Sequence, residues 1–161
     1  MKQRYRRLKN QLEVNNANKE DDKILNSIEG VKLSMETWDK LEKLAKEEFE
    51  ELEKLNKNVK FKNRQFGNFF IRYNNLVLVF TLKNSSNTAV DDKISVSIYE
   101  YFNYDTDHIE ISKMEYLFTI KNAKPYYKLD TYDVRLLSIE DVIEKHFNLY
   151  IDKLLPINKS L

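Results

Sequence analysis

The sequence predicts an α+β fold, in which a long N-terminal amphipathic helix and a C-terminal helix pack on an antiparallel β-meander of four to five strands. Three patterns lead to this prediction. Apolar residues recur with a helical period over residues 34–57, alternate with polar residues over residues 69–121, and return to a helical period after residue 138. Because no helical period separates the strands, tight turns should join them and the sheet should be antiparallel.

The first of these helices should begin at Ser34, a good N-cap, with Thr37 as an alternative cap. Its apolar stripe follows the helical period of about 3.6 residues: Trp38, Leu41, Leu44, Ala45, Phe49, Leu52 and Leu55. We interpret this stripe as core, and keep a homodimer through the helix of residues 34–57 as the alternative.

The strands follow from the period-two alternation. Residues 69–73 and 76–82 should form a hairpin, because Asn74 and Asn75 tolerate the positive φ of a tight turn. Residues 94–102 form a third strand, with Ser95, Ser97, Tyr99 and Tyr101 on its outer face, and residues 105–108 a turn. Residues 109–121 form a fourth strand, which Lys124 and Pro125 should end, and residues 126–136 an edge strand.

A capping box should begin the C-terminal helix, since Asp141 follows Ser138 by three residues. Pro156 should mark the end of this helix. His146 lies on or beside the apolar face of the helix, so we interpret it as a hydrogen-bonded core histidine.

The chain is expected to divide into a basic arm with a polar linker, residues 1–30, and a single α+β domain, residues 31–161. Residues 10–30 are polar and rich in Asn, which is typical of a loop. A short helix at the start of the arm would be marginal by itself, because helix nucleation is costly.

Composition excludes several classes of protein. The 161 residues include no cysteine, two histidines and two glycines, which excludes disulfide frameworks, cysteine-zinc sites and glycine-rich phosphate loops. No apolar run is long enough for a membrane span or a signal peptide, so we expect a cytoplasmic protein. High Lys, Asn and Ile counts, 21, 17 and 12, are typical of an A+T-rich genome and suggest a low-GC bacterium or its phage.

Positive charge is concentrated in two blocks, although the net charge is only +1. Residues 1–10 and 58–84 contain no acid and carry five cations each, and the second block also carries aromatic residues. Cations neutralise phosphates and aromatic rings stack on exposed bases. These blocks therefore supply the candidate residues for binding a nucleic acid or a nucleoprotein: Arg4, Arg6, Arg7, Lys9, Lys60, Lys62, Arg64 and Arg72.

Catalytic chemistry has less support in the sequence. Asp105, Asp107 and Glu110 do not form an EF-hand, because Glu110 stands where the loop needs glycine and Tyr116 where it needs glutamate. We identify no catalytic residue, metal ligand or cofactor site. A small metal-dependent hydrolase or nuclease remains an alternative, as does a protein that binds another protein, such as an antitoxin or immunity protein.

The organisation of the chain resembles that of the type II anti-CRISPR proteins, the small phage-encoded inhibitors of Cas9. The resemblance rests on the basic start Met1-Lys-Gln-Arg-Tyr-Arg-Arg, the charged helix from Ser34, the strand Phe69-Phe-Ile-Arg-Tyr before Asn74 and Asn75, and the last helix from Ser138. It implies a non-enzymatic protein that binds Cas9 itself or the complex of Cas9 with its guide RNA, and blocks target DNA.

Overall fold

The computed structural model of the chain describes residues 2–84, 87–102, 107–130 and 135–159. The elements along the chain are α1 (Lys2–Leu25), α2 (Ile28–Leu55), β1 (Lys60–Gln65), β2 (Asn68–Tyr73), β3 (Leu76–Lys83), β4 (Lys93–Phe102), β5 (Asp107–Lys121), β6 (Lys124–Leu129) and α3 (Ile139–Lys159). The six strands form one sheet in chain order, and every neighbouring pair is antiparallel. The predicted α+β meander is confirmed, with six strands rather than four to five.

β1 accounts for the difference from five strands, whereas β6 corresponds to the edge strand expected over residues 126–136 and ends at Leu129. β1 was not predicted, because five of its six residues are exposed and it lacks the apolar alternation of a half-buried strand. β6 begins at Lys124, where the sequence suggested that the preceding strand would end. Pro125 is compatible with β6 because an edge strand has one side without ladder hydrogen bonds.

Tight turns join β2 to β3 and β5 to β6. Asn74, between β2 and β3, has a φ of 52°, as the Asn-Asn pair predicts. Asn122 and Ala123, between β5 and β6, have φ values of 50° and 61°, the backbone conformation that a two-residue hairpin turn requires. These turns keep β3 beside β2 and β6 beside β5.

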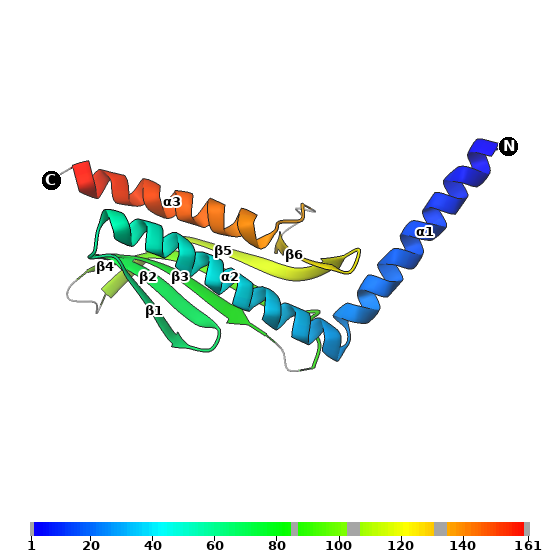
Figure 1. The fold of residues 1–161 in the computed structure, drawn as a ribbon, viewed down its shortest axis with the longest axis horizontal. Coiled ribbons are helices and arrows are strands. Elements are labelled where there is room, and N and C mark those ends of the chain that lie inside the picture. The colour runs from blue at the N-terminus through cyan, green and yellow to red at the C-terminus, as the bar shows by residue number, and fades with distance from the viewer. Residues whose placement is uncertain (1, 85–86, 103–106, 131–134, 160–161) are drawn as a thin grey trace.

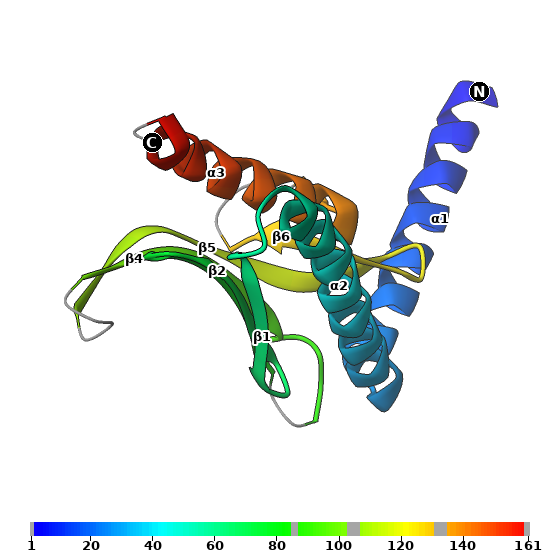
Figure 2. The same ribbon diagram turned by 60° about the vertical axis from the view of Figure 1, so that its left-hand side comes forward.

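Helices α2 and α3 lie side by side on one face of the sheet (Figures 1 and 2). The apolar stripe of α2 packs into the core, where Trp38, Leu41 and Ala45 are fully buried. Most of this stripe therefore packs against the chain's own sheet, as the core interpretation predicted, although Leu55 at its end is 85% exposed. The sheet contributes alternate residues to the core: Phe69, Ile71, Tyr73, Leu76, Leu78, Phe80, Ile94, Val96, Ile98, Tyr116, Phe118, Ile120 and Tyr127.

The N-terminal segment is helical, which corrects the prediction of a polar loop over residues 10–30. The segment contains neither Pro nor Gly before Gly30, and Lys, Arg, Gln, Glu and Leu in it favour helix. α2 begins at Ile28 rather than after Ser34, with Ser27 as its N-cap. Gly30 lies against the end of α1, where a Cβ would be 2.3 Å from the carbonyl oxygen of Ile24.

Asp21 anchors α1 to the sheet. Its carboxylate accepts backbone hydrogen bonds from Asn122 at 3.0 Å and Ala123 at 2.9 Å, and the side chain is buried. The N–H of Ala89 donates to the carbonyl of Leu25 at 3.0 Å, so one of the carbonyls that the C-terminal end of α1 leaves without a partner inside the helix has a hydrogen bond. These contacts fix the direction in which α1 leaves the domain.

Replacing Asp21 by alanine is expected to lower the free energy of unfolding by about 2 kcal/mol, because two backbone donors lose a charged acceptor. Urea unfolding followed by circular dichroism measures this change. Asp22→Ala is the matched control, since its side chain is exposed. Equal stability of the two variants would show that Asp21 does not anchor α1.

The predicted capping box of α3 is confirmed. The Asp141 N–H donates to Ser138 Oγ at 3.1 Å, and the Ser138 N–H donates to Asp141 Oδ2 at 3.0 Å. The helix runs past Pro156 to Lys159, so the predicted end is three residues short. Among the described residues, no helix is both long and apolar enough to cross a membrane.

Candidate nucleic-acid interface

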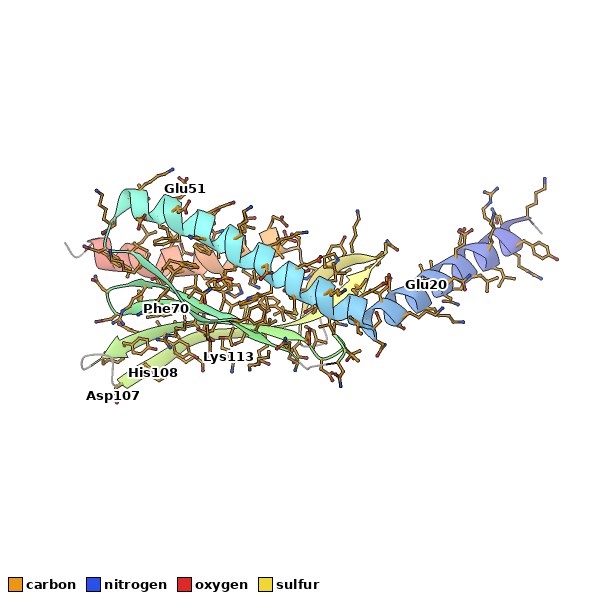
Figure 3. The ribbon with its side chains drawn as sticks, turned by 60° about the horizontal axis from the view of Figure 1, so that its bottom comes forward. Glu20, Glu51, Phe70, Asp107, His108 and Lys113 are labelled. Carbon is orange, nitrogen blue, oxygen red and sulfur yellow. The ribbon has the colours of Figure 1, made fainter. Side chains whose placement is uncertain are left out.

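One face of the sheet carries no helix among the described residues. Successive residues of a strand point to opposite faces, so the neighbours of the core residues form this second face. Figure 3 shows that it lies on the side away from α2, where His108 and Lys113 are labelled. We call it the open face; its residues come from all of β1 to β5.

The predicted basic residues of the second block meet on the open face. Lys60 pairs in register with Arg72, and Lys62 pairs with Phe70, so these four side chains project to the same side. The guanidinium of Arg64 lies 4.6 Å from the centre of the Phe70 ring, which places Arg64 on this face too. The structure thus brings Lys60, Lys62, Arg64 and Arg72 together at the β1–β2 side of the sheet.

The contacts of Lys60, Lys62 and Arg64 leave their positive charge available. The Lys60 ammonium donates to the Lys57 carbonyl at 3.1 Å, and Arg72 Nε donates to the Asn74 carbonyl at 2.8 Å. Among the described residues, neither Lys62 nor Arg64 has an acidic partner. The Lys57 carbonyl and the Phe70 ring orient Lys60 and Arg64 without neutralising their charge.

An aromatic cluster continues the open face at one end of β4. The Arg72 guanidinium lies 5.6 Å from the Tyr101 ring centre. The His108 ring centre is 5.2 Å from those of Tyr101 and Tyr99. Tyr99 and Tyr101 are half-buried and His108 is exposed, so all three rings are accessible.

Among the described residues, the acids of the open face lie at the side away from β1, on β5 and just after β6, where Asp130 pairs with Lys93 at 2.6 Å. Glu115 binds Lys83 at 3.0 Å and lies 3.6 Å from Lys113, and the hydrogen bond from Lys83 is the main cause of its lowered pKa. Glu110 pairs in register with Tyr99. The open face therefore has a positive side at β1–β2 and a mixed side at β5.

The first basic block lies on α1, far from the open-face cations. Arg4, Arg6, Arg7 and Lys9 are exposed and form no ion pair with a described residue. Figure 1 shows the N-terminal end of α1 at the opposite end of the molecule from β1 and β2. The two predicted basic sites are thus separate, a relation that the sequence did not reveal.

Sequence reasoning did not assign His108 and the tyrosines of β4 to the site. The period-two pattern had already placed Tyr99 and Tyr101 on one outer face, which was the available signal. His108 was expected in a turn, but it lies in β5 opposite Tyr101. Residues 105 and 106 of the expected turn lie outside the described residues.

His146 is confirmed as a core residue. It is 1% exposed, and its Nε2 lies 2.6 Å from Tyr116 Oη. Burial, with a smaller contribution from the Lys145 charge, lowers the pKa of His146 to about 4, and burial raises the pKa of Tyr116 to about 12. A substrate cannot reach this pair from solvent.

Within the described ranges, no three His, Asp or Glu side chains lie close enough together to hold a metal ion. Asp105, one of the three acids considered for a hard cation, is outside those ranges.

In comparisons with protein-family models, curated proteins and solved structures, nothing matches this chain. The comparisons assign it to no family. The interpretation of function therefore rests on the surface chemistry described above.

Proposed function

We propose that the protein is a non-enzymatic interaction protein that binds a nucleic acid or a nucleoprotein through the open face. The observation that supports this function is the convergence of Lys60, Lys62, Arg64 and Arg72 at the β1–β2 side of the sheet. β1, β2 and β3 contain no acidic residue. A polyanion can therefore approach this side of the face without meeting a carboxylate from these strands.

The aromatic cluster favours single-stranded nucleic acid over a duplex. Tyr99, Tyr101 and His108 provide π surfaces on which unpaired bases can stack, whereas the bases of a duplex are already stacked. Arg64 and Arg72 lie over aromatic rings, so their planar groups can stack on a base as well as contact a phosphate.

Replacing Lys62, Arg64 and Arg72 together by alanine is expected to weaken binding of a fluorescent single-stranded oligonucleotide by about ten- to a hundredfold. The salt dependence of binding should also fall, by about 0.7 in the logarithmic slope for each lost phosphate contact. Fluorescence anisotropy over a range of salt concentrations measures both effects, with RNA and DNA probes compared.

The matched control removes Lys43 and Lys46 from the exposed side of α2, which changes the charge without touching the open face. Equal binding by the control and the open-face variant would overturn the proposal. Binding to a protein partner that is insensitive to salt would favour the antitoxin or immunity alternative.

The more specific form of the proposal is inhibition of a host defence nuclease such as Cas9, and it is supported by the organisational resemblance alone. In a reconstituted cleavage reaction, the protein should then reduce cutting of target DNA by Cas9 with its guide RNA. The open-face variant should lose this inhibition if the guide complex is the nucleic-acid partner.

A further inference from the structure

The N-terminal part of α1 exposes an apolar stripe of three residues. Tyr5, Leu8 and Leu12 follow one another at spacings of three and four residues, which places them on one side of the helix. Their side chains are 65%, 56% and 53% exposed. Water contact with three large apolar side chains on one stripe is unfavourable, so this side of the helix is suited to a partner.

The stripe faces away from the domain to which α1 is anchored. Asp21 follows Leu12 by nine residues, and Ala17 follows Leu8 by nine, an interval of about two and a half helical turns. Asp21 is buried and Ala17 half-buried against the domain. The apolar stripe is therefore on the opposite side of α1, and the chain's own sheet cannot cover it.

A groove between α2 and α3 has the complementary chemistry. It has a volume of about 290 Å³, and Ile143 and Phe147 form its floor, with Leu44 and Ile151 beside them. The remaining lining residues are three glutamates and an amide: Glu48, Glu140, Glu144 and Asn148. None of the glutamates has an ion-pair partner among the described residues.

Cations lie beside the apolar stripe of α1, and carboxylates lie beside the apolar floor of the groove. Arg4 lies four residues before Leu8, and Lys9 lies four residues after Tyr5, so both flank the stripe. The stripe extends about 10 Å along α1, and the groove about 16 Å along α3, at a rise of about 1.5 Å per residue. The stripe therefore fits within the length of the groove, and its apolar character and charge complement those of the groove.

We propose that the N-terminal part of α1 docks in the α2–α3 groove of a second copy of this chain. Figures 1 and 2 show α1 starting at the end of α2 and extending beyond the rest of the domain, so this part of α1 does not reach the groove of its own chain. The cations beside the stripe complement the glutamates of the groove, which makes a second copy the occupant. Leu8 and Leu12 then contact the apolar floor, and Arg4 and Lys9 pair with the bordering glutamates. Arg6 and Arg7 lie on other sides of α1 and remain exposed to solvent.

Sedimentation velocity of nuclease-treated protein tests the proposal. The wild-type mass should rise above 19.4 kDa with increasing protein concentration. Leu8→Asp with Leu12→Asp should remain monomeric over the same range, with an unchanged circular dichroism spectrum because both side chains are exposed in the single copy. A monomeric wild type, or unaltered association of this variant, would overturn the proposal.

A charge exchange identifies the groove as the docking site. Arg4→Glu with Lys9→Glu, and Glu48→Lys with Glu144→Lys, should each raise the dissociation constant at least about tenfold, and mixing the two variants should restore association. Glu53→Lys is the control, because Glu53 is exposed on α2 and does not line the groove. Failure of the mixture to associate would contradict docking at this site.

This inference does not depend on the proposed nucleic-acid function. The variant with Lys62, Arg64 and Arg72 replaced by alanine should keep its self-association. The variant Glu48→Lys with Glu144→Lys should keep its oligonucleotide binding. If Leu8→Asp with Leu12→Asp loses oligonucleotide binding but associates as the wild type does, then α1 contacts nucleic acid rather than a second copy.

Discussion

Replacing Phe69 by alanine is expected to lower the free energy of unfolding by about 3–5 kcal/mol. Phe69 is fully buried, and its ring centre lies 5.4 Å from that of Trp38, 5.4 Å from that of Phe61 and 4.8 Å from that of Phe80. The substitution leaves a cavity between α2 and the sheet and removes three aromatic contacts at once. Urea unfolding followed by the fluorescence of Trp38, the single tryptophan, measures the loss.

Phe66, a second phenylalanine three residues before Phe69, provides a matched control. It lies in the β1–β2 turn and is 62% exposed, so Phe66→Ala should change stability by less than about 0.5 kcal/mol. Phe69→Leu, which keeps most of the apolar volume, should fall between the two. A loss below about 1 kcal/mol for Phe69→Ala would show that this ring is not central to the core.

Acidification is expected to destabilise the protein through His146. Burial lowers the pKa of the folded-state imidazole to about 4, whereas an unfolded histidine titrates near its ordinary 6.5. Between these two values the unfolded chain binds a proton that the folded chain does not, so stability falls as the pH falls through this window. The full difference corresponds to about 3 kcal/mol, all present above pH 6.5 or so and lost near pH 4.

Comparison with His146→Gln isolates this contribution from that of the acids. Glutamine keeps a hydrogen-bonding group near Tyr116 but does not titrate, so the variant should be less stable at neutral pH and lose less stability on acidification. His108→Gln is the control for the loss of a histidine, because His108 is exposed in the folded protein. If the free energies of unfolding of the wild type and of His146→Gln fall in parallel with pH, His146 is not the cause of the acid destabilisation.

The local period of apolar residues predicted the helices and strands that bury one face in the core. The stripe containing Trp38 and Leu41, the alternation from Phe69 to Tyr73, and the Ser138 capping box all appear in the structure as expected. These features were predictable because burial selects apolar residues at the period of the element, and because a cap uses residues only three apart.

The missed elements lack this local signature. β1 is an exposed edge strand whose register depends on hydrogen bonds to β2. α1 has no amphipathic pattern over its whole length, and its orientation depends on Asp21 reaching a turn 101 residues further along the chain. Contacts of this kind join distant residues through backbone groups, which all residues share, so the sequence gives little indication of them.

By itself, the sequence determined the α+β class, the core of α2 and the meander, and the presence of two acid-free basic blocks. Only the tertiary structure decided that the second block gathers on the sheet face that carries no helix among the described residues, beside Tyr101 and His108, while the first lies on α1 at the far end. The physical reason is that side-chain chemistry and local spacing are written along the chain, whereas strand register and helix docking arise from hydrogen bonds between segments far apart in it.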